Sequence, residues 1–179
     1  IIKSIAFSGE KFISALPNAG YPQIVKDRMI FDNQNVRYFA EKAARILQMD
    51  VNIAKCGGYY HKIIVSECRK ENKSLEEICQ MYKFPPKAVQ LLQEYNYKSL
   101  TLKMKETVVV YLADSVVSSI MYLLEKEQKS EIDYGKIATA IIHRKVDSGI
   151  LNQSDISLSD LCGMEKIFTG EKLYYDFLR

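Results

Sequence analysis

The segment KMKETVVVYLADSVVSSIMYLLEKE, residues Lys103–Glu127, sets the architecture of this chain. From Val108 to Leu124 it is almost wholly apolar and contains no Pro or Gly, and charged residues stand at both of its ends. As an α-helix it would be about 35 Å long, which is the width of a small domain. A helix that is apolar on nearly every side must be covered on nearly every side. We therefore expect it to lie at the centre of a helical domain.

Asp114 interrupts the apolar middle of this segment. Burying an unpaired carboxylate is costly, so a metal ion, a cation or a set of hydrogen-bond donors must face it. The group that meets Asp114 is therefore the first candidate for a functional site.

The composition is that of one cytoplasmic domain spanning residues 1–179. The 25 basic and 22 acidic residues give a net charge of +3 without a basic cluster, which argues against DNA or RNA as a partner. The four cysteines are far apart and form no C-x-x-C pair, as expected for reduced thiols. No signal peptide and no apolar run near 18 residues is present, so we expect no membrane span here. Because the chain begins with Ile1, tethering to a membrane through a preceding segment stays open.

Hydrophobic periodicity predicts helices throughout and no strand, so the expected fold class is all-α. The expected helices cover residues 2–16 (within an N-terminal part, 1–20), 22–29, 36–49, 51–69, 74–82, 86–95, 103–127 and 133–147, and a further helical part begins at 157. Asp32 or Asn33 is expected to cap the third of these helices, Ser74 to Glu77 forms a capping box, and Gly149 ends a helix.

Two adjacent glycines, Gly57 and Gly58, fall inside the predicted helix 51–69. Each costs a helix roughly 1 kcal/mol relative to alanine. A close approach of another backbone would explain why no side chain stands there.

Four ordered stretches resemble one family. They are FAEKAA (39–44), AKCGGYYHK (54–62), KETVVVYLADS (105–115) and KVDSGILNQSDISLSDL (145–161). The second is similar to the A-R-V-G-A-Y-Y-H-D box of HD-domain phosphohydrolases, and the third to their K-E-x-x-x-x-x-L-A-D-S motif. The fourth resembles one branch in particular, the cytoplasmic HD domains of seven-transmembrane cyclic-di-AMP phosphodiesterases. The resemblance covers residues 22–170.

This resemblance implies a bundle of about eight to ten helices in which histidines and aspartates hold two metal ions that activate water. The positions that correspond to the family's metal ligands are Asp32, His61, Lys62, Glu71, Tyr95, Asn96 and Asp114. Only His61 and Asp114 keep the family's residue types. A protonated lysine has no lone pair and cannot bind a metal ion. We therefore expect no metal cofactor, no catalytic residues, and Lys62 as the counter-charge to Asp114.

Three functional hypotheses follow from this pattern. The first is a degenerate, regulatory domain that senses a cyclic dinucleotide or another nucleotide and belongs to a larger membrane protein. Its ligand-binding candidates are Gly57, Gly58, Tyr59, Tyr60, His61 and Lys62. The second is a phosphohydrolase with a site rebuilt around Mg²⁺ or Mn²⁺, which favour oxygen ligands. Its candidate metal ligands are Asp32, His61, Glu71 and Asp114. The third is a purely structural interaction domain.

For several of these residues a structural role is the simpler interpretation. Asp32 is then a helix cap, Glu71 a surface charge, and His61 a hydrogen-bonded core histidine. Tyr59 and Tyr60 are then packing residues rather than a surface on which a purine stacks.

Overall fold

The computed structural model describes residues 23–95, 100–126 and 132–178. The described helices are α3 (Gln23–Ile46), α4 (Val51–Tyr60), α5 (Ile63–Glu71), α6 (Leu75–Met81), α7 (Pro86–Glu94), α8 (Lys105–Lys126), α9 (Tyr134–Asp147), α10 (Leu158–Thr169) and α11 (Lys172–Phe177). No strand occurs in these residues, so the predicted all-α class is confirmed. The helix predicted over 2–16 lies outside the described residues.

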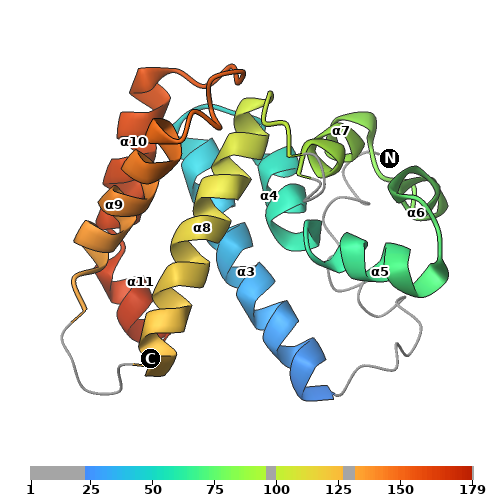
Figure 1. The fold of residues 1–179 in the computed structure, drawn as a ribbon, viewed down its shortest axis with the longest axis horizontal. Coiled ribbons are helices and arrows are strands. Elements are labelled where there is room, and N and C mark those ends of the chain that lie inside the picture. Colours follow the sequence, from blue (N-terminus) through green and yellow to red (C-terminus); the bar gives the residue numbers. More distant parts are fainter. Residues whose placement is uncertain (1–22, 96–99, 127–131, 179) are drawn as a thin grey trace.

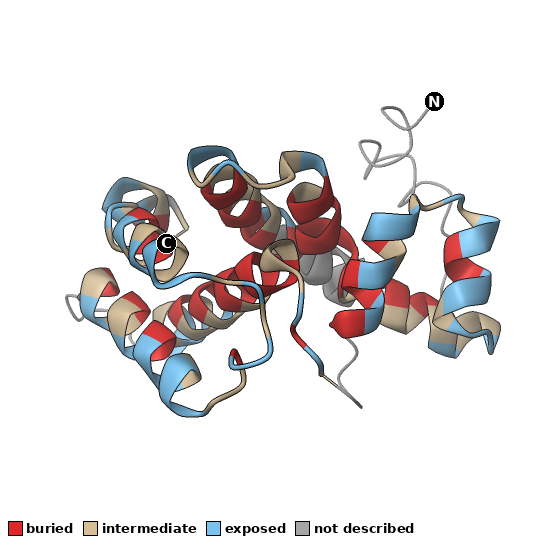
Figure 2. Cartoon of the chain, turned by 90° about the horizontal axis from the view of Figure 1, so that it is seen from above, coloured by how far each residue is buried: buried red, intermediate tan, exposed pale blue. Residues whose placement is uncertain are grey.

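Helix α8 occupies the centre of the molecule, as its sequence predicts. In Figure 1 it runs through the middle, with α9, α10 and α11 on one side, α4 to α7 on the other, and α3 behind it. Figure 2 shows that the buried positions gather in the middle of the molecule, while the outer helices carry the exposed ones. The buried residues include many from α3, α4 and α8, which pack against one another. By length and composition α8 could cross a membrane, and it is the one such helix among the described residues. Here 56% of the apolar 18-residue window of this helix is buried inside the protein.

The start of α8 is fixed by a buried carboxylate that the sequence did not point to. Glu94, in the last turn of α7, accepts hydrogen bonds from the backbone N–H groups of Lys103 and Met104, at 3.1 and 3.0 Å. These are N–H groups that the helix itself cannot satisfy. The contact holds the end of α7 against the beginning of α8.

Several predicted helix ends are confirmed. Ser74 and Glu77 form the capping box of α6, and Ser157 and Asp160 form another at the start of α10. Gly149 follows α9 with a φ of 73°, a conformation that residues with a side chain rarely adopt.

The predicted break between residues 29 and 36 is wrong, because α3 is continuous there. Asp32 and Asn33 lie inside this helix and not at its start. The polar run Asp32–Asn35 is typical of a helix start, but tertiary contacts override that preference. Asn35 is buried and its side-chain oxygen accepts a hydrogen bond from Tyr174, at 2.7 Å.

The single helix predicted over 51–69 is also wrong. Helix α4 ends at Tyr60, and α5 begins at Ile63 after a turn made of His61 and Lys62. A period of about 3.6 residues cannot distinguish one helix from two that are joined by such a short turn. The turn carries the two side chains that face Asp114.

The two glycines of α4 are explained by packing. A Cβ atom built on Gly58 would lie 2.8 Å from the Cα of Arg37, so α3 and α4 approach each other here backbone to backbone. This confirms the predicted close approach. At Gly57, which faces the other way, the side chains of Leu91 and Val110 fill the space of a Cβ.

We expect Gly58→Val to destabilise the fold by about 2–3 kcal/mol, because the backbone of α3 cannot move aside cheaply. Urea unfolding followed by circular dichroism measures this loss. Gly135→Ala is the matched control, since its Cβ would be 3.4 Å from the nearest atom, in ordinary contact. Equal stability of the Gly58 variant and the wild type would contradict the packing explanation.

Candidate functional site

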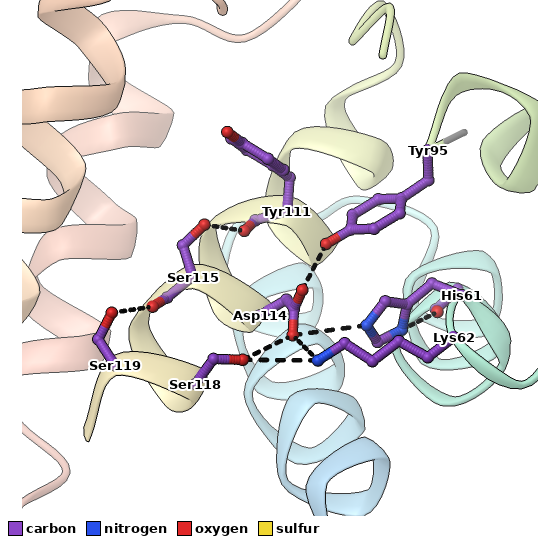
Figure 3. A network of polar contacts seen from close by, with 9 residues as sticks. His61, Lys62, Tyr95, Tyr111, Asp114, Ser115, Ser118 and Ser119 are labelled. Atoms are coloured by element: carbon purple, nitrogen blue, oxygen red, sulfur yellow. Dashed lines mark hydrogen bonds and ion pairs between the residues drawn. The ribbon is translucent and has the colours of Figure 1, made fainter. Parts of the chain in front are cut away.

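Asp114 is surrounded by polar groups from three parts of the chain (Figure 3). Its Oδ1 lies 2.5 Å from the Lys62 Nζ and accepts a hydrogen bond from the Ser118 hydroxyl at 3.0 Å. Its Oδ2 accepts a hydrogen bond from the Tyr95 hydroxyl at 2.7 Å. The His61 Nε2 is 3.6 Å from Oδ1. The predicted contact between Lys62 and Asp114 is confirmed.

Local structure places each of these groups. His61 and Lys62 form the turn between α4 and α5, and Tyr95 is the residue at which α7 ends. Ser118 lies one turn after Asp114 on α8, where residues four apart share a face. The cluster therefore connects α8 to the α4–α5 turn and to the end of α7, which lie on the same side of it (Figure 1).

The exposure of these side chains falls off sharply across the cluster. The side chain of His61 is 0% exposed and that of Asp114 13%, whereas that of Lys62 is 29% exposed. Lys62 therefore joins the buried carboxylate to the surface of the domain.

The electrostatics of the cluster keep Asp114 ionised. Burial acts to raise the pKa of Asp114, but His61 and Lys62 outweigh burial and hold this pKa well below its usual range. A lowered pKa in the folded state stabilises the fold above the pKa of an unfolded aspartate, about 3.9. This contribution is lost as the pH falls towards the folded-state pKa.

The ring of His61 faces an oxygen on each side. Its Nδ1 is 3.1 Å from the carbonyl oxygen of Gly57, one turn earlier, and its Nε2 points towards Asp114. The Nδ1 is within hydrogen-bonding distance of its oxygen, whereas the Nε2 is buried without a hydrogen-bond partner among the described residues. The predicted core role of His61, hydrogen-bonded within its own helix, agrees with this geometry.

The donors at this site do not suit a metal ion. Lys62 and Tyr95 each occupy one oxygen of Asp114, and an ammonium group repels a cation and has no lone pair to offer. In the described part of the chain, no group of three or more His, Cys, Asp or Glu side chains could hold a metal ion. Asp32, His61, Glu71 and Asp114 thus form no such group.

The remaining predicted positions are dispersed. Asp32 is half-buried within α3, and Glu71 ends α5 with its carboxylate 3.6 Å from Lys70. Glu71 thus fits the surface-charge interpretation. Asn96 lies outside the described residues.

The predicted ligand-binding set needs correction. Gly57, Gly58, Tyr59 and Tyr60 are buried in the core, and the two tyrosine rings contact each other edge to face at 5.1 Å. Rings enclosed in this way have no free face for a base. Of the predicted set only Lys62 reaches the surface. Ser118, which was not predicted from the sequence, is also exposed beside Lys62. Its position four residues after Asp114, on the same face of the helix, could have indicated it.

This arrangement of helices is the fold of an HD domain, as the resemblance predicted. The crystal structure of the HD domain of the L. monocytogenes phosphodiesterase PgpH superposes on it with a TM-score of 0.65 and 14% identity, over 83% of this chain and 93% of that one. The same domain in complex with cyclic-di-AMP gives a TM-score of 0.61 and 13% identity, over 79% and 88%. No sequence profile of a known protein family and no curated protein matches this chain.

We expect Lys62→Met to destabilise the domain by about 2–4 kcal/mol, because it leaves a buried carboxylate without its cation. The partial exposure of Lys62 and the remaining hydroxyl donors keep this loss below that of a fully enclosed pair. Asp114→Asn alone is also expected to destabilise, whereas the double variant should lose much less than the sum of the two. Denaturant unfolding of all four proteins at neutral pH measures this coupling.

Lys105→Met is the matched control. Its ammonium group pairs with Asp160 at 2.9 Å, but the lysine side chain is 40% exposed. Such a surface pair contributes no more than about 1 kcal/mol. Strictly additive effects of the Lys62 and Asp114 changes would mean that the two charges do not support each other.

Proposed function

We propose that this chain is a degenerate HD domain that serves as a regulatory or nucleotide-sensing module and does not hydrolyse phosphodiesters. The observation that carries this proposal is the Lys62 ammonium group 2.5 Å from Asp114. The resemblance expects a metal ligand at the position of Lys62, and a positive charge now stands there instead.

The chemistry of the site supports a loss of hydrolysis. Cleaving a phosphodiester needs an activated water, supplied by metal ions or by a general base within reach of it. Both oxygens of Asp114 are engaged, and the ring of His61 is fully buried with its Nδ1 against a backbone carbonyl. The carboxylate is thus committed to these donors, and the His61 Nε2, although it has no hydrogen-bond partner among the described residues, is buried out of reach of a water beside a substrate.

A phosphate group is the ligand that the exposed part of the site suits best. Lys62 has three N–H donors and uses one towards Asp114 and one towards the Ser118 oxygen, at 3.5 Å. The third N–H can contact a phosphate oxygen, and the Ser118 hydroxyl would join it by rotating its O–H from Asp114 to the same oxygen. PgpH, which shares the fold, binds cyclic-di-AMP in a crystal. A cyclic dinucleotide is therefore the first ligand to test, and a cytoplasmic location agrees with the free cysteines of the described residues.

The first expectation concerns metal. The purified protein should contain no stoichiometric Fe, Mn or Zn and should leave cyclic-di-AMP intact when Mn²⁺ is added, because too few donors face Asp114. Elemental analysis and chromatography of the nucleotide measure both properties. The PgpH HD domain, purified in the same way, is the positive control. Two equivalents of metal together with hydrolysis would overturn the proposal, and bound Mg²⁺ or Mn²⁺ with hydrolysis would favour the rebuilt site.

The second expectation concerns the ligand. Cyclic-di-AMP should bind weakly in calorimetry, and Ser118→Ala should lower its affinity about threefold to tenfold, the effect of one hydrogen bond to a charged partner. Ser115→Ala is the matched control, because the hydroxyl of Ser115 donates to the carbonyl of Tyr111 on the same helix. No heat with cyclic-di-AMP or other nucleotides at millimolar concentration would leave the structural interaction domain as the remaining hypothesis.

A further inference from the structure

A groove between α8 and α9 opens beside the Lys62 site. Its volume is about 510 Å³, which is within the range of small-molecule sites. The residues that line it include Ser118, Tyr122 and Leu123 from α8, and Ile137, Ile141 and Arg144 from α9. The groove and the Lys62 site share Ser118. No function derived so far uses the rest of the groove.

The exposed face of α8 explains why this groove exists. Along an otherwise apolar helix, the side chains that stay partly or fully exposed at successive turns are Tyr111, Ser115, Ser118, Ser119 and Tyr122. Figure 3 shows Tyr111 and the three serines along this face of α8. The side chains of Ser115 and Ser119 donate to carbonyl oxygens of their own helix, at 2.8 Å. They are short, so α9 leaves open space over this part of α8.

The walls of the groove are apolar and aromatic. Ile137 and Ile141 stand one turn apart on α9, and Leu123 faces them from α8. Tyr122 is 54% exposed, and Lys126 lies over its ring at 4.5 Å from the centroid. Lys126 thus covers part of the Tyr122 ring, and a flat ring can pack against the remaining exposed part and the branched aliphatic side chains beside it.

Arg144 supplies a charge that no group among the described residues neutralises. Within the part of the chain that the structure describes, its guanidinium group makes no hydrogen bond or ion pair, and no carboxylate lines the groove. This differs from Lys62, whose charge is taken up by Asp114. Lys145, the next residue, already has a hydrogen-bond partner, because its ammonium group donates to the Tyr111 hydroxyl at 2.8 Å. Arg144 is thus the cation that the groove offers to a ligand.

We propose that the α8–α9 groove binds a small molecule made of a flat ring system and an anionic group, with the ring against Tyr122 and Ile141 and the anion on Arg144. Nucleoside monophosphates and aromatic carboxylates share this chemistry. A guanidinium group forms paired hydrogen bonds with either anion, and the apolar walls select the ring. The proposal rests on the groove alone and holds whether or not a nucleotide binds at Lys62.

The test is a titration of the complete, isotope-labelled chain with AMP, 1-naphthoate and the uncharged adenosine, followed by amide chemical shifts. AMP or 1-naphthoate should shift amides of α8 and α9, and whichever binds more tightly identifies the source of the anion. Arg144→Gln should weaken binding of the anion about fivefold to tenfold, as expected for a partly exposed charged contact, and leave adenosine unchanged. Lys136→Gln, which removes an exposed charge from the same helix, should change neither.

A second variant tests the cavity itself. Ala140 is exposed and lines the groove, so Ala140→Phe fills it without entering the core. It should abolish binding of all three compounds at an unchanged melting temperature. Lys62→Arg should leave AMP binding in the groove intact, which separates this site from the one proposed at Lys62. Equal AMP affinity in the Arg144 variant and the wild type, undiminished binding after Ala140→Phe, or no shift in α8 and α9 at about 10 mM ligand would overturn the proposal.

Discussion

The ion pair between Lys62 and Asp114 is the contact on which the arrangement of α8 depends. Helix α8 is covered by α3, α4 and α9, and it carries one ionised carboxylate into that contact region. Because a buried charge without a partner is destabilising, the α4–α5 turn must present a cation to this point of α8. The cation comes from a turn that two glycines hold close to α3 and α7. Backbone packing and charge pairing thus support each other.

A metal centre would connect these helices by coordination, and here hydrogen bonds and one ion pair connect the same elements. Lys62 and Ser118 satisfy one oxygen of Asp114, and Tyr95 satisfies the other. The aromatic ring of Tyr95 also packs against the ring of His61, with 4.9 Å between centroids. A tyrosine therefore contributes both a donor and apolar contact. These groups satisfy the charge of Asp114 and also fill the space around it.

The sequence predicted the parts of this structure that depend on strong local or electrostatic constraints. An apolar segment of the length of α8 has to be central, and a lone aspartate inside it has to meet a cation or donors. That Lys62 is this cation was implied by the family resemblance, which places both residues at metal-ligand positions of one site. The continuity of α3 could not be foreseen, because the burial of Asn35 depends on Tyr174, far along the chain. The role of Glu94 was missed for the same reason, since its partners are backbone groups that sequence patterns do not display. Tyr59 and Tyr60 illustrate a different limit. The family motif predicted that tyrosines stand at these positions, but it gave no information on whether their side chains are exposed or buried.

Two cations lie beside the open face of α8, Lys62 in the α4–α5 turn and Arg144 on α9, and they bear on how such a domain would report a ligand. A phosphate bound at Lys62 would compete with Asp114 for its charge. Binding there would therefore be linked to the contact between α8 and the α4–α5 turn, because a ligand that favours one arrangement of a contact shifts the population towards it. Arg144 forms no ion pair within the described residues, so an anion bound to it would leave the Lys62–Asp114 ion pair intact. The two neighbouring sites, which share Ser118, would thus have different effects. A ligand at Lys62 would alter the packing of α4 and α5 on α8, whereas a ligand at Arg144 would add contacts between α8 and α9.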